Sequence, residues 1–464
     1  MTLYGINPRT GERLEPGVHE ATAEEVAALG AAAARAAGPL GELPLAERAA
    51  LLVAVADALD AAADELVALA DAETALGQTR LTGEVARTTG QLRLLAAETQ
   101  RDDFRGEVAE EGFLRTLLPI GPVAVYAASN FPFAFSVAGG DTASALAAGC
   151  PVIVKAHPGH PGTSARTAEL VSEALAKSGA PEGTFAIVHG FEAGLTLIND
   201  PHIKAAGFTG SVRGGRALFD AAAARPEPIP FYGELGSINP VFVTEAAVGA
   251  RGTEIATGYV GSFTLGSGQF CTKPGLVFLP AGHGLEQTLA ETIAPIGEPA
   301  LLTPQIAEGF AKGRERLGES ARTLAESAGA HLYTVTAEEF AARPELAEEC
   351  FGPASVIIEY SSPEELIAAA ASVPGSLTAT VHAEPSDAGL TKALVTELSK
   401  RAGRIIYNGW PTGVAVNRAQ QHGGPYPATT SARDTSVGTA SIRRWQVPVT
   451  FQGLPADLLP ATVR

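Results

Sequence analysis

The sequence contains one cysteine whose neighbours favour a reactive thiol. Cys271 lies in the stretch Gly266-Ser267-Gly268-Gln269-Phe270-Cys271-Thr272-Lys273-Pro274-Gly275. Glycines allow the backbone to approach a ligand closely, and Pro-Gly ends a regular element. Lys273 would favour the thiolate, which is the nucleophilic form of a thiol. The stretch therefore predicts either a nucleophile or a small buried residue in a loop.

Two polar residues follow predicted buried strands in the first half of the chain. Asn130 lies in the motif Ser129-Asn130-Phe131-Pro132-Phe133. An asparagine there either forms a turn or donates an amide N–H to a developing oxyanion. Lys155 ends the run Pro151-Val152-Ile153-Val154-Lys155. It is either a solvated lysine or a ligand for the ribose or phosphate of a nucleotide.

Three further motifs have the residue types of a site. Gly210 and Ser211 precede a predicted helix, whose N-terminus is a plain cap or an anion site that fits a pyrophosphate. This motif lacks the full G-x-G-x-x-G fingerprint. Glu234 is a carboxylate in an uncharged stretch, either ion-paired or a base tuned by burial. The last motif is Glu348-Glu349-Cys350-Phe351-Gly352-Pro353.

Alternating strand and helix patterns connect the motifs in the first half of the chain. The expected elements are strands at 123–126, 151–155, 185–189 and 205–209, and helices at 138–149, 164–178, 192–199 and 213–224. Such β-α units predict a parallel sheet with helices on both faces. Ligands bind beyond the carboxyl ends of these strands, so Asn130, Lys155 and Ser211 point to one crevice.

The N-terminal part of the chain is predicted to be mainly helical. Residues 4–18 are extended, and a helix begins at Thr22, whose spacing to Glu25 is that of a capping box, and runs to about Ala37. Two more helical patterns cover 44–75 and 80–100. The charged stretch 101–119 predicts a surface hairpin. The alternating tail 443–451 predicts an edge strand that could pair with 101–119 of another subunit.

A second mixed block runs from about 232 to 424. Its expected elements are strands at 238–243, 275–279, 355–359, 376–382 and 403–407, and helices at 252–260, 304–329 and 363–371. Together with the first block, this length is too great for one core and predicts two or three domains.

Composition excludes several classes of protein. The 464 residues carry a net charge of −18, which argues against a nucleic-acid or anionic-membrane binder because both need a basic face. Three cysteines, Cys150, Cys271 and Cys350, lack the spacing of a disulfide framework or a zinc site, so we expect no metal and a reducing compartment. No signal peptide or membrane span is visible, so we expect a cytoplasmic protein.

Together, in this order and spacing, the motifs resemble the aldehyde dehydrogenase superfamily over nearly the whole chain. The separation of Glu234 from Cys271 is close to that family's spacing of base and nucleophile. Three motifs resemble the branch that contains NADP-dependent 2,5-dioxovalerate (α-ketoglutarate semialdehyde) dehydrogenases and bacterial long-chain aldehyde dehydrogenases: 128–136, Lys155-Ala156-His157-Pro158 and His422-Gly423-Gly424-Pro425-Tyr426-Pro427-Ala428-Thr429.

The resemblance implies an α/β fold with three parts. The first is a Rossmann-type parallel-sheet cofactor domain, and the second is an α/β catalytic domain. The third is a small β oligomerisation arm, and the protein would be a homodimer or homotetramer. The expected ranges are 1–100 and 120–231 for the cofactor domain, 232–424 for the catalytic domain, and 101–119 and 440–464 for the arm.

The resemblance also assigns the chemistry. Cys271 would attack the aldehyde carbon, and the Asn130 side-chain amide with the Cys271 backbone N–H would hold the oxyanion. Hydride transfer would leave a thioester, which water activated by Glu234 would hydrolyse. The cofactor ligands would be Lys155 at the adenosine ribose, Gly210 and Ser211 at the pyrophosphate, Glu349 at the nicotinamide ribose and Phe351 packed near that ribose.

Two departures from the family pattern matter. Many NAD-specific members carry a glutamate where this chain has Pro158, so a carboxylate that would repel a 2′-phosphate is missing. His157 could also help a phosphate. We therefore expect NADP as the preferred cofactor, with NAD possible. Lys273 would lower the thiol pKa, pair with a distal substrate carboxylate, or remain solvated.

The expected activity is oxidation of an aldehyde to its acid, with a semialdehyde such as 2,5-dioxovalerate favoured and aliphatic (fatty) aldehydes as the alternative. A CoA-acylating enzyme is less expected, because it has no use for Glu234 as a hydrolytic base. A cysteine hydrolase would pair Cys271 with one of nine histidines, but none stands in a distinctive motif. A non-catalytic relative would be expected to lose some of Cys271, Glu234 and Asn130.

Overall fold

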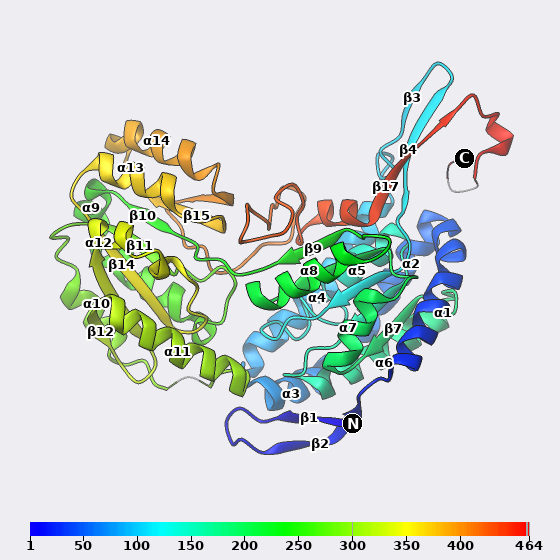
Figure 1. Ribbon diagram of the computed structural model, residues 1–464, viewed down its shortest axis with the longest axis horizontal. Helices are drawn as coiled ribbons and strands as arrows, with labels where there is room; N and C mark the ends of the chain where they lie inside the picture. The colour runs from blue at the N-terminus through cyan, green and yellow to red at the C-terminus, as the bar shows by residue number, and fades with distance from the viewer. Residues whose placement is uncertain (299, 461–462, 464) are drawn as a thin grey trace. The chain divides into compact units, whose positions relative to one another are not determined.

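The chain folds as two units, each built on a wholly or mainly parallel sheet of its own (Figure 1). The computed structural model describes residues 1–298, 300–460 and 463. Unit 1 comprises Met1–Glu234, Val416–Gln420 and Asp434–Arg464, and unit 2 comprises Leu235–Ala415 and Gln421–Arg433. The segments predicted as two blocks therefore form two separate sheets.

The sheet of unit 1 contains the four strands predicted in the first half of the chain and one strand that was not predicted. Its order is β7-β6-β5-β8-β9, and all neighbours are parallel. The strands are β5 (Val123–Tyr126), β6 (Val152–Lys155), β7 (Phe185–Val188), β8 (Ala205–Thr209) and β9 (Phe231–Glu234). The unpredicted β9 is short and follows Pro230, and its last residue is Glu234.

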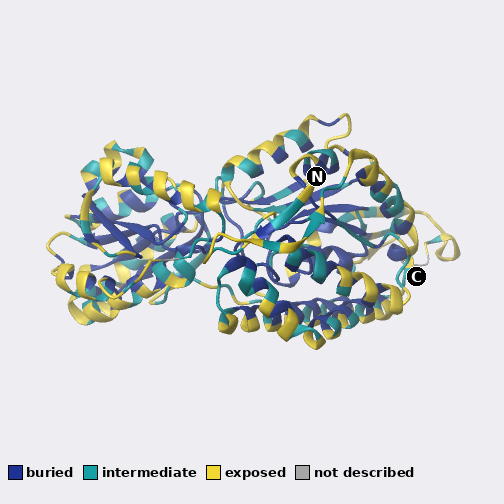
Figure 2. Cartoon of the chain, turned by 90° about the horizontal axis from the view of Figure 1, so that it is seen from below, coloured by how far each residue is buried: buried dark blue, intermediate teal, exposed yellow. Residues whose placement is uncertain are grey.

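Both faces of this sheet are covered, as its uninterrupted apolar strands require. Val123 and Val125 of β5 pack into one buried cluster, and Ala124 and Tyr126 pack into another on the opposite face. The first cluster includes apolar residues of α2 to α6, and the second includes those of α1, α7 and α8. Figure 2 shows the buried strands inside helices whose outer sides are exposed.

Local sequence signals place the helices of unit 1. Thr22 caps α1 (Ala23–Glu42) in a capping box with Glu25, as predicted, and the helix continues past Ala37. The helix expected over 44–75 is two helices, because the chain bends at Ala62. The others are α2 (Leu45–Ala61), α3 (Ala63–Thr74), α4 (Gln78–Thr99), α5 (Gly140–Ala148), α6 (Pro161–Lys177), α7 (Phe191–Asn199) and α8 (Val212–Ala224).

Two small antiparallel sheets complete unit 1. At the N-terminus, β1 (Thr2–Ile6) pairs with β2 (Arg13–His19). The predicted hairpin is β3 (Val108–Glu110) with β4 (Phe113–Pro119), and β17 (Gln446–Gln452) lies on the other side of β4 (Figure 1).

The pairing expected for the C-terminal strand with another subunit is wrong. β17 pairs with β4 of the same chain along its whole length, from Gln446 opposite Pro119 to Gln452 opposite Phe113. The chain's own hairpin thus satisfies that strand's backbone groups on one side. Residues 461, 462 and 464 of the predicted arm lie outside the described residues.

The sheet of unit 2 has the order β12-β13-β14-β11-β10-β15-β16, in which β12 is antiparallel to its neighbour and the other pairs are parallel. Its strands are β10 (Val241–Val243), β11 (Leu276–Pro280), β12 (Arg322–Glu326), β13 (His331–Thr336), β14 (Ala354–Tyr360), β15 (Ser376–His382) and β16 (Ala402–Tyr407). The expected strand 238–243 is shortened, because Asn239 adopts a left-handed φ of 51° and Pro240 follows it.

Helices cover both faces of the unit 2 sheet. They are α9 (Glu245–Thr264), α10 (Glu286–Ile293), α11 (Pro304–Ser320), α12 (Ala337–Ala342), α13 (Pro363–Ser372) and α14 (Ala388–Leu398). The helix expected over 304–329 is wrong beyond Ser320, because the next residues pair with β13 as β12. In the core, the rings of Phe242 and Phe278 stack with centroids 4.5 Å apart. Among the described residues, no helix has the length and apolar character to span a membrane.

Candidate active site

Four predicted site residues share one edge of the unit 1 sheet. Lys155 and Glu234 are the last residues of β6 and β9, Asn130 follows β5, and Ser211 follows β8. These strands are adjacent and parallel, so their carboxyl ends meet at the same edge. The crevice predicted for Asn130, Lys155 and Ser211 thus corresponds to neighbouring strand ends, where ligands bind in such sheets.

Asn130 is buried, and its backbone is held by an arginine on a distant helix. The Arg80 Nη2 of α4 donates to the Asn130 carbonyl oxygen at 2.6 Å. A fixed backbone limits the directions in which the Asn130 side-chain amide can point. That rigidity suits a donor for an oxyanion, which works best when it is held in place before the reaction.

Glu234 is buried, and a hydroxyl contacts its carboxylate. The Ser436 Oγ donates to Glu234 Oε2, and the Gly210 N–H donates to the Glu234 carbonyl at 3.0 Å. The carboxylate is therefore hydrogen-bonded and oriented. Sequence reasoning missed Ser436, because it lies far along the chain in a stretch with no motif.

Lys155 is half-buried at the end of β6. Burial lowers the pKa of its ammonium to about 8. At neutral pH the side chain is still mostly protonated, so it can attract an anionic nucleotide. An added Cβ at Gly194 of α7 would lie 3.3 Å from the Lys155 side chain, so the two segments pack closely.

His157 does not supply the positive charge considered for a phosphate. Burial, together with the nearby His160 and Lys155, lowers its pKa well below the usual range. Its Nδ1 accepts a hydrogen bond from the Gly159 N–H at 3.0 Å. The ring is thus neutral at neutral pH and can offer a phosphate only an N–H donor.

Ser211 is the N-cap of α8, and its Oγ accepts from the Gly214 N–H at 3.2 Å. Gly210 and Ser211 are both exposed. The N-terminus of a helix of this length favours anions, and Lys155 ends a strand of the same sheet. The donor set of unit 1 therefore fits the phosphates and ribose of a dinucleotide.

In unit 2, consecutive left-handed residues shape the loop before Cys271. Gly266, Ser267 and Gly268 of the short helix η1 (Leu265–Gly268) have φ values of 57°, 59° and 66°. A Cβ at Gly268 would lie 2.3 Å from the backbone of Gly352. The close approach predicted from the glycines is thus to another loop of the protein, the one that follows Glu349.

Cys271 has a histidine partner within unit 2. Its Sγ lies 3.7 Å from Nε2 of His422, which is buried. The sequence interpretation, which found no histidine in a distinctive motif, therefore missed His422 as the neighbour of the thiol. A signal was present in the sequence, because His422 begins one of the motifs that carry the family resemblance. That motif does not show, however, that the His422 side chain lies beside the Cys271 thiol.

Lys273 has a structural place that none of the sequence interpretations anticipated. Its ammonium donates to the carbonyl oxygens of Cys350 at 2.6 Å, Gly352 at 3.1 Å and Ala354 at 2.7 Å. It is buried, and burial lowers its pKa. It is neither solvated nor available to a substrate carboxylate, and it ties the chain beyond Cys271 to the 350–354 loop.

The same loop carries Glu349 and Phe351, both half-buried. Burial raises the pKa of the Glu349 carboxyl to about 7, and the Lys273 charge opposes that rise. Near neutral pH this carboxyl is therefore close to half-protonated. In either form it can hydrogen-bond a hydroxyl, which is the chemistry of a ribose ligand.

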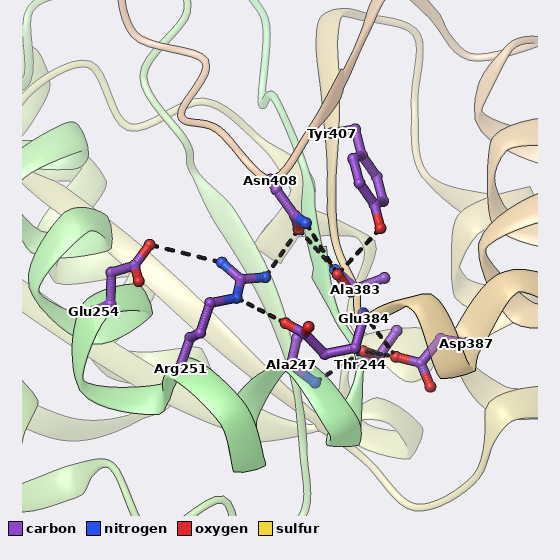
Figure 3. Close-up of polar contacts among 9 residues, drawn as sticks. All are labelled: Thr244, Ala247, Arg251, Glu254, Ala383, Glu384, Asp387, Tyr407 and Asn408. Atoms are coloured by element: carbon purple, nitrogen blue, oxygen red, sulfur yellow. Dashed lines mark hydrogen bonds and ion pairs between the residues drawn. The ribbon is translucent and has the colours of Figure 1, made fainter.

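A polar network anchors the chain where it leaves β16 (Figure 3). Asn408, with a left-handed φ of 51°, exchanges hydrogen bonds with Ala383 at the end of β15, accepting at 2.9 Å and donating at 3.0 Å. Arg251 of α9 donates to Asn408 at 3.0 Å and to Glu384 at 2.7 Å. The network fixes the start of the segment that leads towards His422.

That segment also contacts the residue after the thiol. The Gly413 N–H donates to the Thr272 Oγ1 at 3.2 Å, and Arg404 of β16 donates to the Gly413 carbonyl at 3.1 Å. The Asn239 side-chain amide donates to the carbonyls of Cys271 at 2.8 Å and Lys273 at 2.9 Å. Side chains from several elements thus hold the Cys271 loop.

The structure brings the predicted residues together in two groups. One group lies in unit 1 and contains Asn130, Lys155, His157, Gly210, Ser211 and Glu234; the other lies in unit 2 and contains Cys271, Glu349 and Phe351.

Comparison with known proteins gives consistent matches. Residues 2–294 match the aldehyde dehydrogenase family. The alpha-ketoglutaric semialdehyde dehydrogenase 2 of Azospirillum brasilense is 44% identical, over 99% of this chain and 93% of the relative. The alpha-ketoglutaric semialdehyde dehydrogenase of Acinetobacter baylyi is 42% identical, over 83% of this chain and 78% of the relative.

Solved structures share the fold at low sequence identity. An aldehyde dehydrogenase of Pseudomonas syringae, complexed with NAD+ and octanal, has a TM-score of 0.84 at 22% identity and covers 99% of this chain and 95% of its own. The 1-pyrroline-5-carboxylate dehydrogenase of Thermus thermophilus has a TM-score of 0.83 at 21% identity and covers 97% and 89%. The α/β fold predicted from the sequence, with its small antiparallel arm, is confirmed.

Proposed function

This chain belongs to the aldehyde dehydrogenase family, and from that premise we propose that it oxidises a carboxylate-bearing semialdehyde to the diacid with NADP. The observation that carries the proposal is the pair formed by Cys271 and His422, with Sγ and Nε2 3.7 Å apart. A thiol next to an imidazole can lose its proton to that imidazole, which makes it a nucleophile at neutral pH.

The proposed reaction begins with that proton transfer. His422 takes the thiol proton, and the Cys271 sulfur forms a bond to the aldehyde carbon, whose oxygen becomes an oxyanion. The Asn130 side-chain N–H and the Cys271 backbone N–H stabilise this oxyanion. When bound, the dinucleotide supplies the acceptor for the hydride that the carbon then loses.

Hydrolysis of the resulting thioester is assigned to Glu234. Its carboxylate removes a proton from a water molecule, the hydroxide adds to the acyl carbon, and the carbon–sulfur bond breaks to release the acid and the Cys271 thiolate. The hydrogen bond from Ser436 supports this role, because it orients one carboxylate oxygen. The CoA-acylating alternative gives no use for a carboxylate oriented in this way.

NADP as the preferred cofactor is supported by residue types in unit 1. Pro158 stands where a carboxylate would repel a 2′-phosphate, and Lys155 offers a cation near neutral pH. Gly210 and Ser211 at the N-terminus of α8 would bind the pyrophosphate. Glu349 and Phe351 of unit 2 would bind the nicotinamide ribose, and His157 would contribute a neutral donor.

A semialdehyde substrate is supported by the relatives' names and by charge near Asn130. Arg87 of α4 lies over the rings of Phe135 and Phe131, at 5.1 and 5.9 Å from their centroids. Arg80 lies over the Phe131 ring at 5.1 Å. The Arg87 guanidinium beside the loop of Asn130 suits a substrate with a carboxylate at its far end, whereas Arg80 is engaged with the Asn130 carbonyl. Aliphatic aldehydes remain the alternative, since the Pseudomonas syringae relative is complexed with octanal.

We also propose that unit 1 acts as the cofactor domain, unit 2 as the catalytic domain, and β3, β4 and β17 as an arm for a homodimer or homotetramer. Exposed apolar side chains on this arm, Val108 and Phe113, support the assembly role. Sedimentation equilibrium of the wild type against a Phe113→Glu variant tests it; a monomeric wild type would contradict it.

The test of function follows reduced cofactor at 340 nm with NADP or NAD and with 2,5-dioxovalerate or hexanal. We expect turnover by the wild type, none by Cys271→Ala, and a higher kcat/KM for NADP and for the acid-bearing aldehyde. A tenfold preference for NAD contradicts the cofactor assignment. Wild type inactive with both aldehydes, although it binds nucleotide, contradicts the proposed function.

Arg87→Met separates the two substrate classes. A lost charged hydrogen bond is worth about 1.5–3 kcal/mol, so KM for 2,5-dioxovalerate should rise roughly 10–100-fold while KM for hexanal stays the same. Equal changes for both aldehydes would assign Arg87 no part in carboxylate binding.

A further inference from the structure

One face of α4 holds the loop that carries Asn130. Arg80 and Glu84 are four residues apart on this helix, so their side chains lie one above the other on the same face. Both contact the backbone of residues 130–134, which we call the donor loop. All of these residues belong to unit 1.

Glu84 binds the far half of the donor loop. Its Oε1 accepts from the Phe133 N–H at 2.8 Å and from the Ala134 N–H at 3.1 Å. Glu84 is 4% exposed, and this burial raises the pKa of its carboxyl, a rise that Arg80 and the two N–H groups oppose. A buried carboxyl is costly unless it is hydrogen-bonded, so its place here implies a specific use.

Arg80 binds the near half of the same loop. Its Nη2 donates to the Asn130 carbonyl at 2.6 Å, and its guanidinium lies 5.1 Å from the centroid of the Phe131 ring. One guanidinium therefore contacts both the Asn130 carbonyl and the ring of the next residue, Phe131.

Backbone hydrogen bonds close the base of the donor loop. Ala128 N–H donates to Phe135 O at 2.9 Å, and Gly140 N–H donates to Ala134 O at 3.0 Å. Arg80 and Glu84 act at other points of the loop, on the Asn130 carbonyl and on the N–H groups of residues 133 and 134, and so help to orient the backbone that carries the Asn130 side chain.

We propose that Arg80 and Glu84 are positioning residues that aim the Asn130 amide at the substrate oxyanion. The proposal rests on the proposed function, because it takes Asn130 as the oxyanion donor. An electrostatic donor is effective only when it is already in place, and a displacement of about 1 Å can cost roughly 10²-fold in rate. This clamp, formed by Arg80 and Glu84, therefore acts on kcat through Asn130, and neither side chain contacts the reacting atoms.

The test compares Arg80→Met and Glu84→Gln with Asn130→Ala and with the double variants. Each single α4 variant should lower kcat about 10–100-fold and leave KM for NADP unchanged. In the Asn130→Ala background neither should lower kcat further, since there is no amide left to aim. Arg80→Lys, which keeps a donor, should recover part of the loss.

Glu73→Gln is the matched control. Glu73 of α3 is also a buried glutamate, and it accepts from the backbone N–H groups of Gly162 at 2.8 Å and Thr163 at 2.7 Å. Its effect on kcat should be small, and it should add fully to that of Asn130→Ala. Effects of Arg80→Met and Glu84→Gln that also add fully would overturn the proposal.

Hydrogen exchange gives a readout that does not depend on activity. The amides of residues 130–135 should exchange faster in Glu84→Gln and Arg80→Met than in the wild type, and Glu73→Gln should leave their rates unchanged. Unchanged exchange in the α4 variants would overturn the clamp even if they lose activity. An inactive wild type with faster exchange in the variants would contradict the proposed function but support the clamp.

Discussion

The two units position their candidate residues in different ways. In unit 1 the residues lie at or just beyond the ends of adjacent strands, as Lys155 and Glu234 do. In unit 2, Cys271 and Glu349 lie in loops, and side chains distant in sequence hold these loops through their backbone carbonyls. The first arrangement follows from the topology of a parallel sheet, whereas the second depends on individual contacts.

The difference predicts where single substitutions act. A strand end keeps its position when one neighbouring side chain is lost, because the sheet hydrogen bonds remain. A loop held by one ammonium loses its geometry with that ammonium. We therefore expect the largest effects in unit 2, and the predictions below run from the largest to the smallest.

Lys273→Met should lower the free energy of unfolding by about 3 kcal/mol, because buried carbonyls that lose their donor cost about 1–3 kcal/mol each and loss of the buried charge offsets part of this. Urea unfolding followed by tryptophan fluorescence measures the change. The control is Lys312→Met on α11, whose exposed ammonium pairs with Glu308 at 2.6 Å and should change the free energy of unfolding far less. Equal effects would mean that the three carbonyl bonds add no stability.

His422→Gln should lower kcat roughly 100-fold and slow the alkylation of Cys271 by iodoacetamide, since no imidazole remains to take the thiol proton. Steady-state kinetics and mass spectrometry of the modified peptide measure both quantities. His283→Gln, at another buried histidine of unit 2, should change neither. Normal alkylation in the His422 variant would assign the pair a structural role only.

Gly268→Ala should lower the free energy of unfolding by about 2–5 kcal/mol, since a left-handed φ costs about 1–2 kcal/mol and contact with the Gly352 backbone about 1–3 kcal/mol. The control is Gly284→Ala, which shares a φ near 67° but has open space around it. The difference between the two, from urea unfolding, isolates the contact between the two loops. Equal changes in the free energy of unfolding for the two variants would show that the loops move apart at no cost.

Lys155 gives the smallest effect, and it depends on pH. Its pKa is lowered to about 8, so the cation is present below that pH and is lost as the pH rises through it. Kd for NADP should therefore increase, by about tenfold or less, between pH 7 and pH 9. Titration by fluorescence checks this. The Lys155→Met variant should bind more weakly and show a flat profile, and tighter binding at pH 9 would contradict the role.

Local signals account for what the sequence predicted well. The capping box of Thr22 and Glu25 identified the start of α1, and β15 was predicted with its observed bounds, 376–382. Strand ends followed by polar residues identified Asn130, Lys155 and Ser211. In these places the structure is decided by residues close together in the chain.

Non-local contacts account for what the sequence could not give. The strand β12 was taken for helix, because its pairing with β13 does not show in its own residues. His422 contacts a thiol 151 residues earlier, and Ser436 contacts a carboxylate 202 residues earlier. Lys273 was read from its neighbours in sequence, although its partners lie 77 to 81 residues later.

The enclosure of Lys273 has one more consequence. An amine held on three carbonyls is shielded from acylating reagents as long as the 350–354 loop stays closed. The rate at which Lys273 is acylated therefore measures how often this loop opens. Lys273 lies two positions after the Cys271 thiol in the sequence. Acylation of Lys273 thus reports directly on the opening of the loop that carries Glu349 and Phe351.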